Sequence, residues 1–393
     1  MDIKTKGSSS IFFLIIKIKT HQVLSLLHFS KQTQTHSTLT PTKTKKKPNS
    51  STMVQNKSAI FLKYPTEYPV AGEHIDIQSK ELTVELEDND VLLRNLYFSL
   101  DPYMRGRMRD AKSYVAGFQI GEAMSGYGVS EVIESKNDAY PVGTIVSGFT
   151  GWQEYSVIPG ASGLRVLPGA RESPIPLSAY LGVLGMPGLT AYASLKIIGK
   201  PKAGETIFVS AAAGAVGQLV GQMAKKLGLR VVGSAGSDDK VDYLINELKF
   251  DAAFNYKKNG TILENLKRAA PEGIDIYYEN VGGETLEAAL EVMKDHGRVI
   301  ACGMISQYNT QQPYGIRNLH HIVSKRIVMQ GFIASDFVGE SGAFGKDVGS
   351  WLVNKEIIYR EDVAEGIDAS PEAFVGMLQG KNFGKAVVKI ADL

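Results

Sequence analysis

The chain has 393 residues, of which 44% are hydrophobic and 21% charged, with 43 lysines and arginines, 41 acidic residues and one cysteine. This length predicts about two domains of roughly 150 residues each, and the composition is that of a globular protein with a large core. The single cysteine, Cys302, excludes an internal disulfide framework and any structural zinc site that needs several thiolates.

Residues 1–52 differ from the remainder in charge. They carry nine lysines, no arginine and one acidic residue, a formal charge of +8, whereas residues 53–393 sum to −6. The mildly acidic body lacks the basic field of a nucleic-acid-binding protein, so we expect no nucleic-acid partner. The longest apolar stretch of the first segment, 11–16, is far shorter than the ~20 residues of a membrane span, so we expect no membrane association.

We interpret residues 1–52 as a disordered basic extension, because they lack hydrophobic periodicity. A secretory signal fits poorly, since its apolar region usually has ~7–15 residues. A transit peptide fits better, being rich in serine and poor in acids, although transit peptides favour arginine over lysine. The other alternative is an extension without function, with Met53 as the natural start. We expect a cytoplasmic enzyme, or an organellar one if residues 1–52 act as a transit peptide.

The body divides into two unlike parts. Residues 53–175 show short β-like runs separated by Gly and Pro and predict a compact, partly antiparallel β domain. Residues 176–339 alternate β-like runs with helical patterns, which predicts a doubly wound parallel sheet. The tail, 357–393, predicts a helix and a last strand that rejoin the first domain, because the parallel sheet already has six strands. The six runs are 207–210, 231–235, 252–255, 274–278, 298–302 and 327–332, and the fold class is α/β.

The most informative motif follows the first of these six runs, where AAAGAVG at 211–217 opens a helix. It aligns with the dinucleotide fingerprint G-x-G-x-x-G, with the first glycine replaced by alanine. Gly214 lets the backbone approach a pyrophosphate, Gly217 lets the helix pack on the strand, and the helix N-terminus favours the anion. The alternative is a purely structural turn. The predicted pyrophosphate-binding residues are Ala211, Ala212, Ala213, Gly214, Ala215, Val216 and Gly217.

The end of the next run indicates which dinucleotide binds. An NAD site usually has an acidic residue there, about 20 residues on, to accept from the ribose 2′-hydroxyl. Here Gly236 and Ser237 leave room for a 2′-phosphate, and Lys240 can reach it as a point charge. The alternative is that Lys240 is a solvated helix residue. We therefore predict NADP rather than NAD.

The sequence also lacks several catalytic patterns. The histidines of the body, His74, His296, His320 and His321, have no metal-ligand spacing, so we predict no metal. No G-x-S-x-G nucleophile elbow follows a strand. Hydride transfer to a carbon–carbon double bond conjugated to a carbonyl needs no metal, only a donor that stabilises the developing enolate oxygen. Tyrosine is a natural donor of this kind.

Seven segments together resemble the zinc-independent branch of the medium-chain dehydrogenase/reductases, and within it the alkenal/prostaglandin double-bond reductases. The resemblance covers residues 53–393. It rests on NLYFSLDPYMRGRM at 95–108, GVLGMPGLTAYASL at 182–195, VSAAAGAVGQLVGQ at 209–222, VGSAGSDDK at 232–240, DIYYENVGG at 275–283, CGMISQYN at 302–309 and GKNFGKAVV at 380–388.

This resemblance implies a GroES-like catalytic domain (53–175 and 340–393), a Rossmann NADP-binding domain (176–339), and an NADPH-dependent 2-alkenal reductase acting on a small hydrophobic enal or enone. Tyr308 would stand near the substrate carbonyl as a catalytic residue, and Tyr103 would be a second one in the cleft. A homodimer through the edge of the Rossmann sheet and a substrate pocket shaped in part by 338–351 are also implied. Further cofactor contacts would come from Pro102, Gly236, Lys240, Tyr256, Asn280, Cys302, Phe332, Ile333, Ala334 and Asn382.

The sequence alone is also compatible with other functions. An NADPH quinone reductase or a metal-free alcohol dehydrogenase would use the same fold and cofactor. A member of another class would bind NADP without catalysis, as a binding or structural protein. The physiological substrate and the stereochemistry of the product are not encoded in these motifs.

Overall fold

The computed structural model describes residues 52–393, so the predicted extension at 1–52 lies outside the described residues except for Thr52. The strands are β1 (Thr52–Phe61), β2 (Ile75–Val84), β3 (Val91–Ser99), β4 (Ser125–Ser135), β5 (Ile145–Gly151), β6 (Tyr155–Ile158), β7 (Arg165–Val166), β8 (Thr206–Val209), β9 (Arg230–Ala235), β10 (Ala252–Asn255), β11 (Ile274–Glu279), β12 (Met293–Ala301), β13 (Val328–Gly331), β14 (Glu361–Glu365) and β15 (Lys385–Lys389). The α-helices are α1 (Met104–Arg107), α2 (Met186–Ser194), α3 (Gly217–Lys226), α4 (Asp238–Asp242), α5 (Ile262–Ala269), α6 (Gly283–Val292), α7 (His320–Ser324), α8 (Ser341–Val353) and α9 (Ser370–Leu378).

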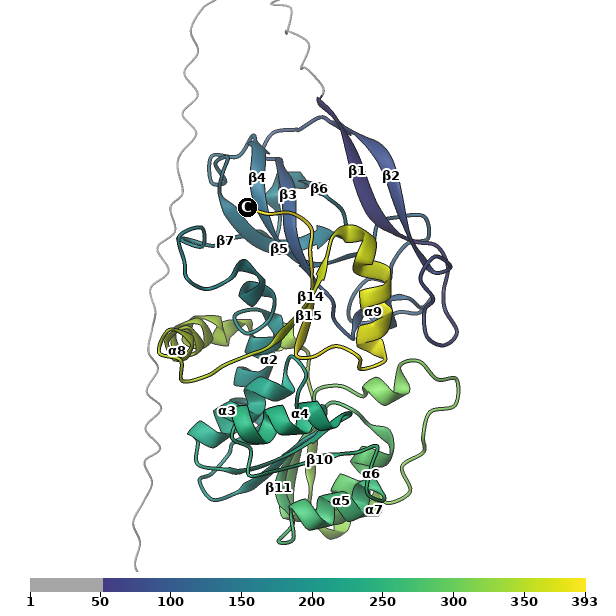
Figure 1. Cartoon of the computed structure of the whole chain (residues 1–393), viewed down its shortest axis with the longest axis vertical. Helices are drawn as coiled ribbons and strands as arrows, with labels where there is room; N and C mark the ends of the chain where they lie inside the picture. The colour runs from purple at the N-terminus through teal and green to yellow at the C-terminus, as the bar shows by residue number, and fades with distance from the viewer. Residues whose placement is uncertain (1–51) are drawn as a thin grey trace, which may run out of the picture. The chain divides into compact units, whose positions relative to one another are not determined.

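The six predicted parallel strands form one sheet in the order β10-β9-β8-β11-β12-β13, with every pair parallel. Side chains of a strand alternate between the two faces of a sheet, so both faces of a fully buried strand need cover. Ile207 and Val209 of β8 pack in one buried cluster with α3, while Phe208 packs in another with α5 and α6. Helices therefore cover both faces, as Figure 1 shows for α3 and α4 on one side and α5 and α6 on the other. The doubly wound prediction is confirmed.

The second sheet combines strands β3 to β7 with the C-terminal strands β14 and β15. Its order is β14-β15-β3-β4-β5-β7, with β6 also paired to β3, and β1 and β2 form a separate antiparallel pair. The C-terminal strand β15 runs antiparallel to β3, so the yellow tail lies beside the blue strands in Figure 1. Phe374 of α9 meets the buried Trp152 ring at 5.6 Å, and Trp152 stacks on Phe98 of β3 at 4.8 Å. The tail thus rejoins the β domain, as predicted.

The helix α8 packs with the parallel-sheet domain rather than with the β domain. Its Phe344 and Val348 belong to the same buried cluster as Ala191 of α2 and Val209 of β8. The residue boundaries predicted for the two domains, 53–175 with 340–393 and 176–339, remain predictions, and this packing favours an end of the parallel-sheet domain after α8.

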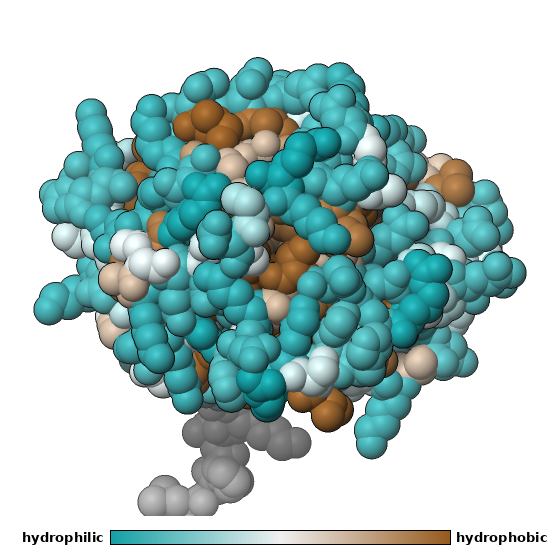
Figure 2. Space-filling model, turned by 90° about the horizontal axis from the view of Figure 1, so that it is seen from below, coloured by the Kyte–Doolittle hydropathy of each residue, from teal (hydrophilic) through white to brown (hydrophobic). Residues whose placement is uncertain are grey.

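Seen from below, the end of the molecule that carries the parallel sheet is covered mainly by hydrophilic residues, with hydrophobic ones in small separate patches (Figure 2). Among the helices of residues 52–393, none combines the length and the apolar character needed to cross a membrane. Many of the large apolar side chains are gathered in the buried clusters on the two faces of the parallel sheet and inside the β domain.

Candidate active site

A cavity of about 1260 Å³ lies between the two domains. The parallel sheet contributes residues that follow the carboxyl ends of all six strands, β8 to β13, which is where doubly wound sheets bind ligands. The β domain contributes the segment after β3 and the segment between α9 and β15. With one exception, every predicted site residue lines this cavity: Pro102, Tyr103, Ala211, Ala213, Gly214, Ala215, Val216, Gly217, Gly236, Lys240, Tyr256, Asn280, Cys302, Tyr308, Phe332, Ile333, Ala334 and Asn382.

The exception is Ala212, which is fully buried beneath the turn and is not part of the cavity wall. Its backbone N–H donates to the carbonyl of Ser234 in β9 at 2.9 Å, which ties the turn to the sheet. Its two neighbours, Ala211 and Ala213, do line the cavity. Motif spacing placed all seven residues of the turn together, but it does not determine which of them point inward.

The turn at 211–217 has the backbone that a pyrophosphate site needs. A Cβ on Gly217 would lie 2.6 Å from the Ala211 carbonyl oxygen and 2.7 Å from the Ala212 Cα, so only glycine fits there. Ala211 itself has a φ of +47°, a left-handed conformation that is strained for alanine and is often found at functional sites. The ten-residue helix α3 begins at Gly217, so the positive end of its dipole lies at this turn, where it favours a bound anion.

The region after β9 has one cationic side chain in the cavity wall and no acidic one. Lys240 is half-buried, and its Nζ donates to the carbonyl oxygen of Gly380 at 2.8 Å. Burial lowers the pKa of Lys240, although Asp239 opposes that shift. A Cβ on Gly236 would lie 2.9 Å from the Tyr256 hydroxyl, so these residues lie close together. Asp238 points to other partners, Lys258 at 2.5 Å and Asn255 at 2.7 Å.

The carboxyl end of β11 is fixed by a buried carboxylate. Glu279 is fully buried, and its Oε1 accepts from the Tyr277 hydroxyl at 2.7 Å and from the N–H groups of Val281 and Gly282 at 2.6 and 2.9 Å. Burial raises the pKa of Glu279. The next residue, Asn280, donates its side-chain amide to the Ser210 carbonyl at 2.7 Å. Glu279 thereby shapes the turn that presents Asn280 to the cavity.

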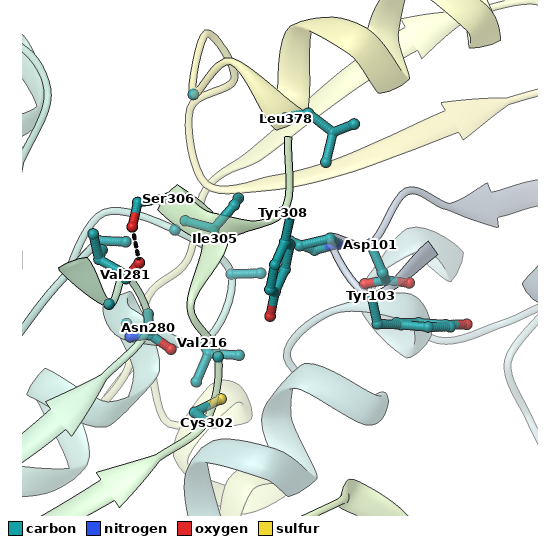
Figure 3. A pocket seen from close by; sticks show the side chains of 18 of the residues that line it. Asp101, Tyr103, Val216, Asn280, Val281, Cys302, Ile305, Ser306, Tyr308 and Leu378 are labelled. Atoms are coloured by element: carbon teal, nitrogen blue, oxygen red, sulfur yellow. Dashed lines mark hydrogen bonds between the residues drawn. The ribbon is translucent and has the colours of Figure 1, made fainter. Parts of the chain in front are cut away.

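Cys302 follows the end of β12 and borders the cavity next to Val216, as Figure 3 shows. Burial raises the pKa of its thiol to about 12, so the thiol is protonated at neutral pH. A protonated thiol is a poor nucleophile, because the thiolate is the reactive form. The geometry favours a packing role for Cys302 against the cofactor.

Tyr308 presents its hydroxyl to the open part of the cavity (Figure 3). The hydroxyl oxygen accepts the backbone N–H of Met304 at 3.2 Å, which leaves its own proton available for a ligand. A Cβ on Gly303 would lie 3.1 Å from the same oxygen, so a larger residue there would crowd it. Burial raises the pKa of Tyr308, so the hydroxyl is a donor at neutral pH.

Tyr103 lies on the β-domain side of the same cavity, and its ring packs against the core of that domain. In Figure 3 its hydroxyl points away from Tyr308. The hydroxyl is buried and has no hydrogen-bond partner within residues 52–393, and burial raises its pKa strongly. The catalytic role of Tyr103 remains a prediction, and this orientation favours a role for its ring rather than for its hydroxyl.

Two groups of cavity residues were missed from the sequence. The first is a buried ion pair between Asp101 and Lys385, whose side chains are 4% and 2% exposed and whose charged atoms are 3.2 Å apart. Lys385 also donates to the carbonyl oxygens of Leu100 and Ala386 at 2.6 and 2.7 Å. The adjacent Gly384 donates its N–H to the Ala213 carbonyl at 3.1 Å. The pair joins the end of β3 to the start of β15 within the β domain, and the Gly384 hydrogen bond connects this wall to the phosphate-binding turn.

The second missed group is a set of exposed aromatic residues in the cavity wall, all from the β domain. Tyr127 and Phe149 are register partners on β4 and β5, with ring centroids 5.7 Å apart, and Tyr68 and Tyr114 line the same region. Paired aromatic positions on neighbouring strands were the available signal. The segment 338–351, which the resemblance implied would shape the substrate pocket, is absent from the cavity wall, because α8 packs on α2.

A β domain combined with a doubly wound parallel-sheet domain, with a phosphate-binding turn in the cleft between them, defines a two-domain oxidoreductase of the medium-chain dehydrogenase/reductase superfamily. Two family models match the chain: one described as the N-terminal domain of oxidoreductase, over residues 57–166, and one described as zinc-binding dehydrogenase, over residues 215–346. Across residues 52–393, no cluster of three or more His, Cys, Asp or Glu side chains is arranged to hold a metal ion.

Individual relatives narrow the family. An NADP-dependent 2-alkenal reductase of Nicotiana tabacum is 47% identical over 343 residues, covering 86% of this chain and 98% of that protein. Prostaglandin reductase 1 of Rattus norvegicus is 43% identical over 339 residues, covering 86% and 100%. The crystal structure of CurA from Vibrio vulnificus in complex with NADPH matches with a TM-score of 0.79 at 39% identity, covering 86% of this chain and 100% of that chain. The chain belongs to the family of NADP-dependent alkenal and prostaglandin reductases within this superfamily.

Proposed function

We propose that this protein reduces the carbon–carbon double bond of α,β-unsaturated aldehydes and ketones with NADPH. The observation that carries the proposal is the single cavity that joins a dinucleotide turn, a cation suited to a 2′-phosphate and a tyrosine hydroxyl with a free proton. The names of its relatives, a 2-alkenal reductase and a prostaglandin reductase at 43–47% identity, support the same reaction. When bound, NADPH supplies the hydride that adds to the β-carbon of the substrate.

The residues of the chain fit this cofactor. The N–H groups at the start of α3 and the close approach allowed by Gly214 suit the pyrophosphate. Lys240 and Tyr256 flank the place proposed for the 2′-phosphate, and Gly236 leaves the space between them. Residues proposed to border the nicotinamide and its ribose are Pro102, Asn280, Cys302, Phe332, Ile333, Ala334 and Asn382.

Tyr308 is the residue proposed to act on the substrate. Its hydroxyl donates a hydrogen bond to the carbonyl oxygen, and that bond strengthens as the oxygen becomes an enolate. Because the Met304 N–H occupies a lone pair of the hydroxyl, the proton is directed toward the ligand. The aromatic wall of Tyr68, Tyr127 and Phe149 excludes water from the substrate and contacts its apolar part.

The test is a comparison of NADPH oxidation by the purified protein with three acceptors: an aryl or short-chain enone, a quinone and a saturated ketone. We expect turnover with the enone and formation of the saturated carbonyl product. Turnover of the quinone alone would identify a quinone reductase, and turnover of the saturated ketone alone an alcohol dehydrogenase. NADPH binding without turnover of any acceptor would identify a non-catalytic member.

We also propose a homodimer. The strand β13 lies at the open edge of the parallel sheet, and Val328 at its start is 56% exposed, so its unpaired backbone can add a strand from a second copy. Sedimentation equilibrium of the full chain tests this, with Val328→Lys expected to give a monomer. A dimer that persists in that variant would place the interface elsewhere.

For the cellular location we propose the cytoplasm, because residues 1–52 contain lysine but none of the arginine typical of transit peptides. A fluorescent fusion of the full chain, compared with one that starts at Met53, tests this. If the fusion of the full chain gives organellar fluorescence and the fusion that starts at Met53 does not, residues 1–52 act as a transit peptide.

A further inference from the structure

Two arginines, one within α1 and one just after it, reach from the β domain to the segment that carries Tyr308. Arg109, just after α1, donates from Nη2 to the backbone carbonyl of Tyr308 at 2.7 Å. Arg105, within α1, donates from Nε to the side-chain oxygen of Asn309 at 2.8 Å. The residue proposed to bind the substrate carbonyl is therefore held from the opposite domain through its own backbone and its neighbour's side chain.

Arg105 is unusual because it is a buried cation that forms no ion pair with a carboxylate of residues 52–393. It is 1% exposed, and its other acceptors are the carbonyl oxygens of Pro65 at 3.0 Å and Glu67 at 2.8 Å. No hydrogen-bond partner for its Nη1 exists within residues 52–393, and the same holds for Nδ2 of Asn309. Burial lowers the pKa of Arg105 to about 10, with Arg109 adding to the shift.

Burying an ion without a counter-ion destabilises a fold, so an apolar residue would give a more stable junction here. A guanidinium offers what an apolar residue cannot, namely several donors in a rigid fork that fixes acceptors from two segments at once. Those acceptors belong to the loop before Tyr68 and to the segment at 308–309, while Arg105 itself follows Tyr103. The guanidinium thus joins three stretches of chain that each supply a cavity-lining tyrosine.

We propose that Arg105 is a positioning residue that holds Tyr308 in place through Asn309, with Arg109 as a second contact. The inference rests on the proposed function, in which Tyr308 binds the substrate carbonyl. Neither Arg105 nor Asn309 lines the cavity, so both act on the reaction only through the placement of Tyr308. Misplacement of a reacting group by about 1 Å can reduce a rate by about 10²-fold, so even a small shift is measurable.

The first test replaces Asn309 by leucine, which has a similar size but no acceptor. For Asn309→Leu we expect kcat with an enone to fall by about 10–100-fold, on the scale of a 1 Å displacement. The dissociation constant for NADPH should stay nearly the same. With deuterated NADPH, the isotope effect on kcat should rise, because the chemical step becomes slower. Asn309→Asp, which keeps an acceptor for Arg105, should recover most of the lost kcat.

A matched control separates positioning from simple loss of stability. Asn56 is also buried, at 6% exposure, and its amide exchanges two hydrogen bonds with the Tyr155 backbone inside the β domain. Asn56→Leu should lower the melting temperature while kcat per folded protein and the isotope effect stay at their wild-type values. If Asn309→Leu behaves like Asn56→Leu, or if Asn309→Asp is as slow as Asn309→Leu, the positioning role of Arg105 is wrong.

Hydrogen exchange supplies a readout that does not depend on turnover. In Asn309→Leu, and in Arg105→Met, the amides of residues 304–310 should exchange faster than in the wild type, whereas those of α3 should not change. The exposed Arg109 provides a variant that will fold, and Arg109→Gln should also speed exchange in 304–310. Unchanged exchange in Arg109→Gln and Asn309→Leu would overturn the inference. If the wild type does not turn over an enone, the proposed function is wrong instead. Hydrogen exchange in residues 304–310 would still decide whether Arg105 holds that segment in place.

Discussion

The preference for NADPH over NADH is the property that one substitution should change most clearly. Lys240 is the only cation that follows the carboxyl end of β9 in the cavity wall of residues 52–393. Lys240→Ala removes a charge-assisted hydrogen bond, which contributes about 1.5–3 kcal/mol. At about 1.4 kcal/mol per tenfold change, NADPH should bind roughly 10–150-fold more weakly.

The structure places the expected effect in the upper part of this range. Lys240 is half-buried, so solvent screens its charge less than that of a free surface lysine. Its Nζ is already held at the cavity by the Gly380 carbonyl, so a phosphate meets an ammonium with little remaining freedom. NADH lacks the 2′-phosphate, and its affinity should change little.

The assay is a fluorescence titration of the wild type and Lys240→Ala with NADPH and with NADH. Lys267→Ala on the exposed part of α5 serves as a control for the loss of one positive charge, and it should bind both cofactors like the wild type. Equal weakening of NADPH and NADH in Lys240→Ala would refute the 2′-phosphate role and indicate a general distortion of the cleft. Unchanged NADPH affinity would refute it as well.

Three further substitutions test the site. Tyr308→Phe removes one donor to the developing enolate oxygen, so kcat with an enone should fall by about 10²–10³-fold at unchanged NADPH affinity. Because burial raises the pKa of Tyr308, kcat of the wild type should not depend on this group near neutral pH and should fall only when the pH passes that raised pKa. Gly217→Ala places a methyl group 2.6 Å from the Ala211 carbonyl oxygen, and the overpacking, about 1–3 kcal/mol, should displace the turn and weaken NADPH in the same titration. Lys385→Met leaves Asp101 as a buried carboxylate without its cation and should lower the free energy of unfolding, measured with urea, by about 3–5 kcal/mol.

Each of these expectations has its own control and its own contrary result. Tyr140→Phe, which removes a hydroxyl bonded to the Leu164 carbonyl in the β domain, should leave kcat unchanged, and a Tyr308→Phe enzyme that is equally active would exclude the donor role. Wild-type NADPH affinity in Gly217→Ala would mean that the turn does not contact the pyrophosphate. An unfolding midpoint of Lys385→Met equal to that of the wild type would mean that the buried pair contributes no net stability.

Local patterns in the sequence were sufficient for the order and type of the elements. The six β-like runs predicted for the parallel sheet coincide with β8 to β13 within a few residues, and the fingerprint at 211–217 leads into α3 as predicted. Both results depend on short-range properties: the short apolar runs of buried strands and the small residues that a tight turn requires. The predicted site residues of the parallel-sheet domain line the cavity, except for Ala212, because the carboxyl ends of parallel strands meet at one edge of the sheet.

The direction of individual side chains and the contacts between distant segments were decided only by the tertiary structure. Periodicity does not distinguish Ala212, buried under the turn, from its neighbours in the cavity wall, nor does it give the direction of the Tyr103 hydroxyl. The Asp101–Lys385 pair and the Arg105–Asn309 contact each join residues far apart in the chain, from segments with no shared motif. The first contact forms because β3 and β15 are neighbours in the β-domain sheet, and the second because the two domains pack around one cleft. A one-dimensional pattern records which residues a segment offers, and the packed domains determine which of them meet.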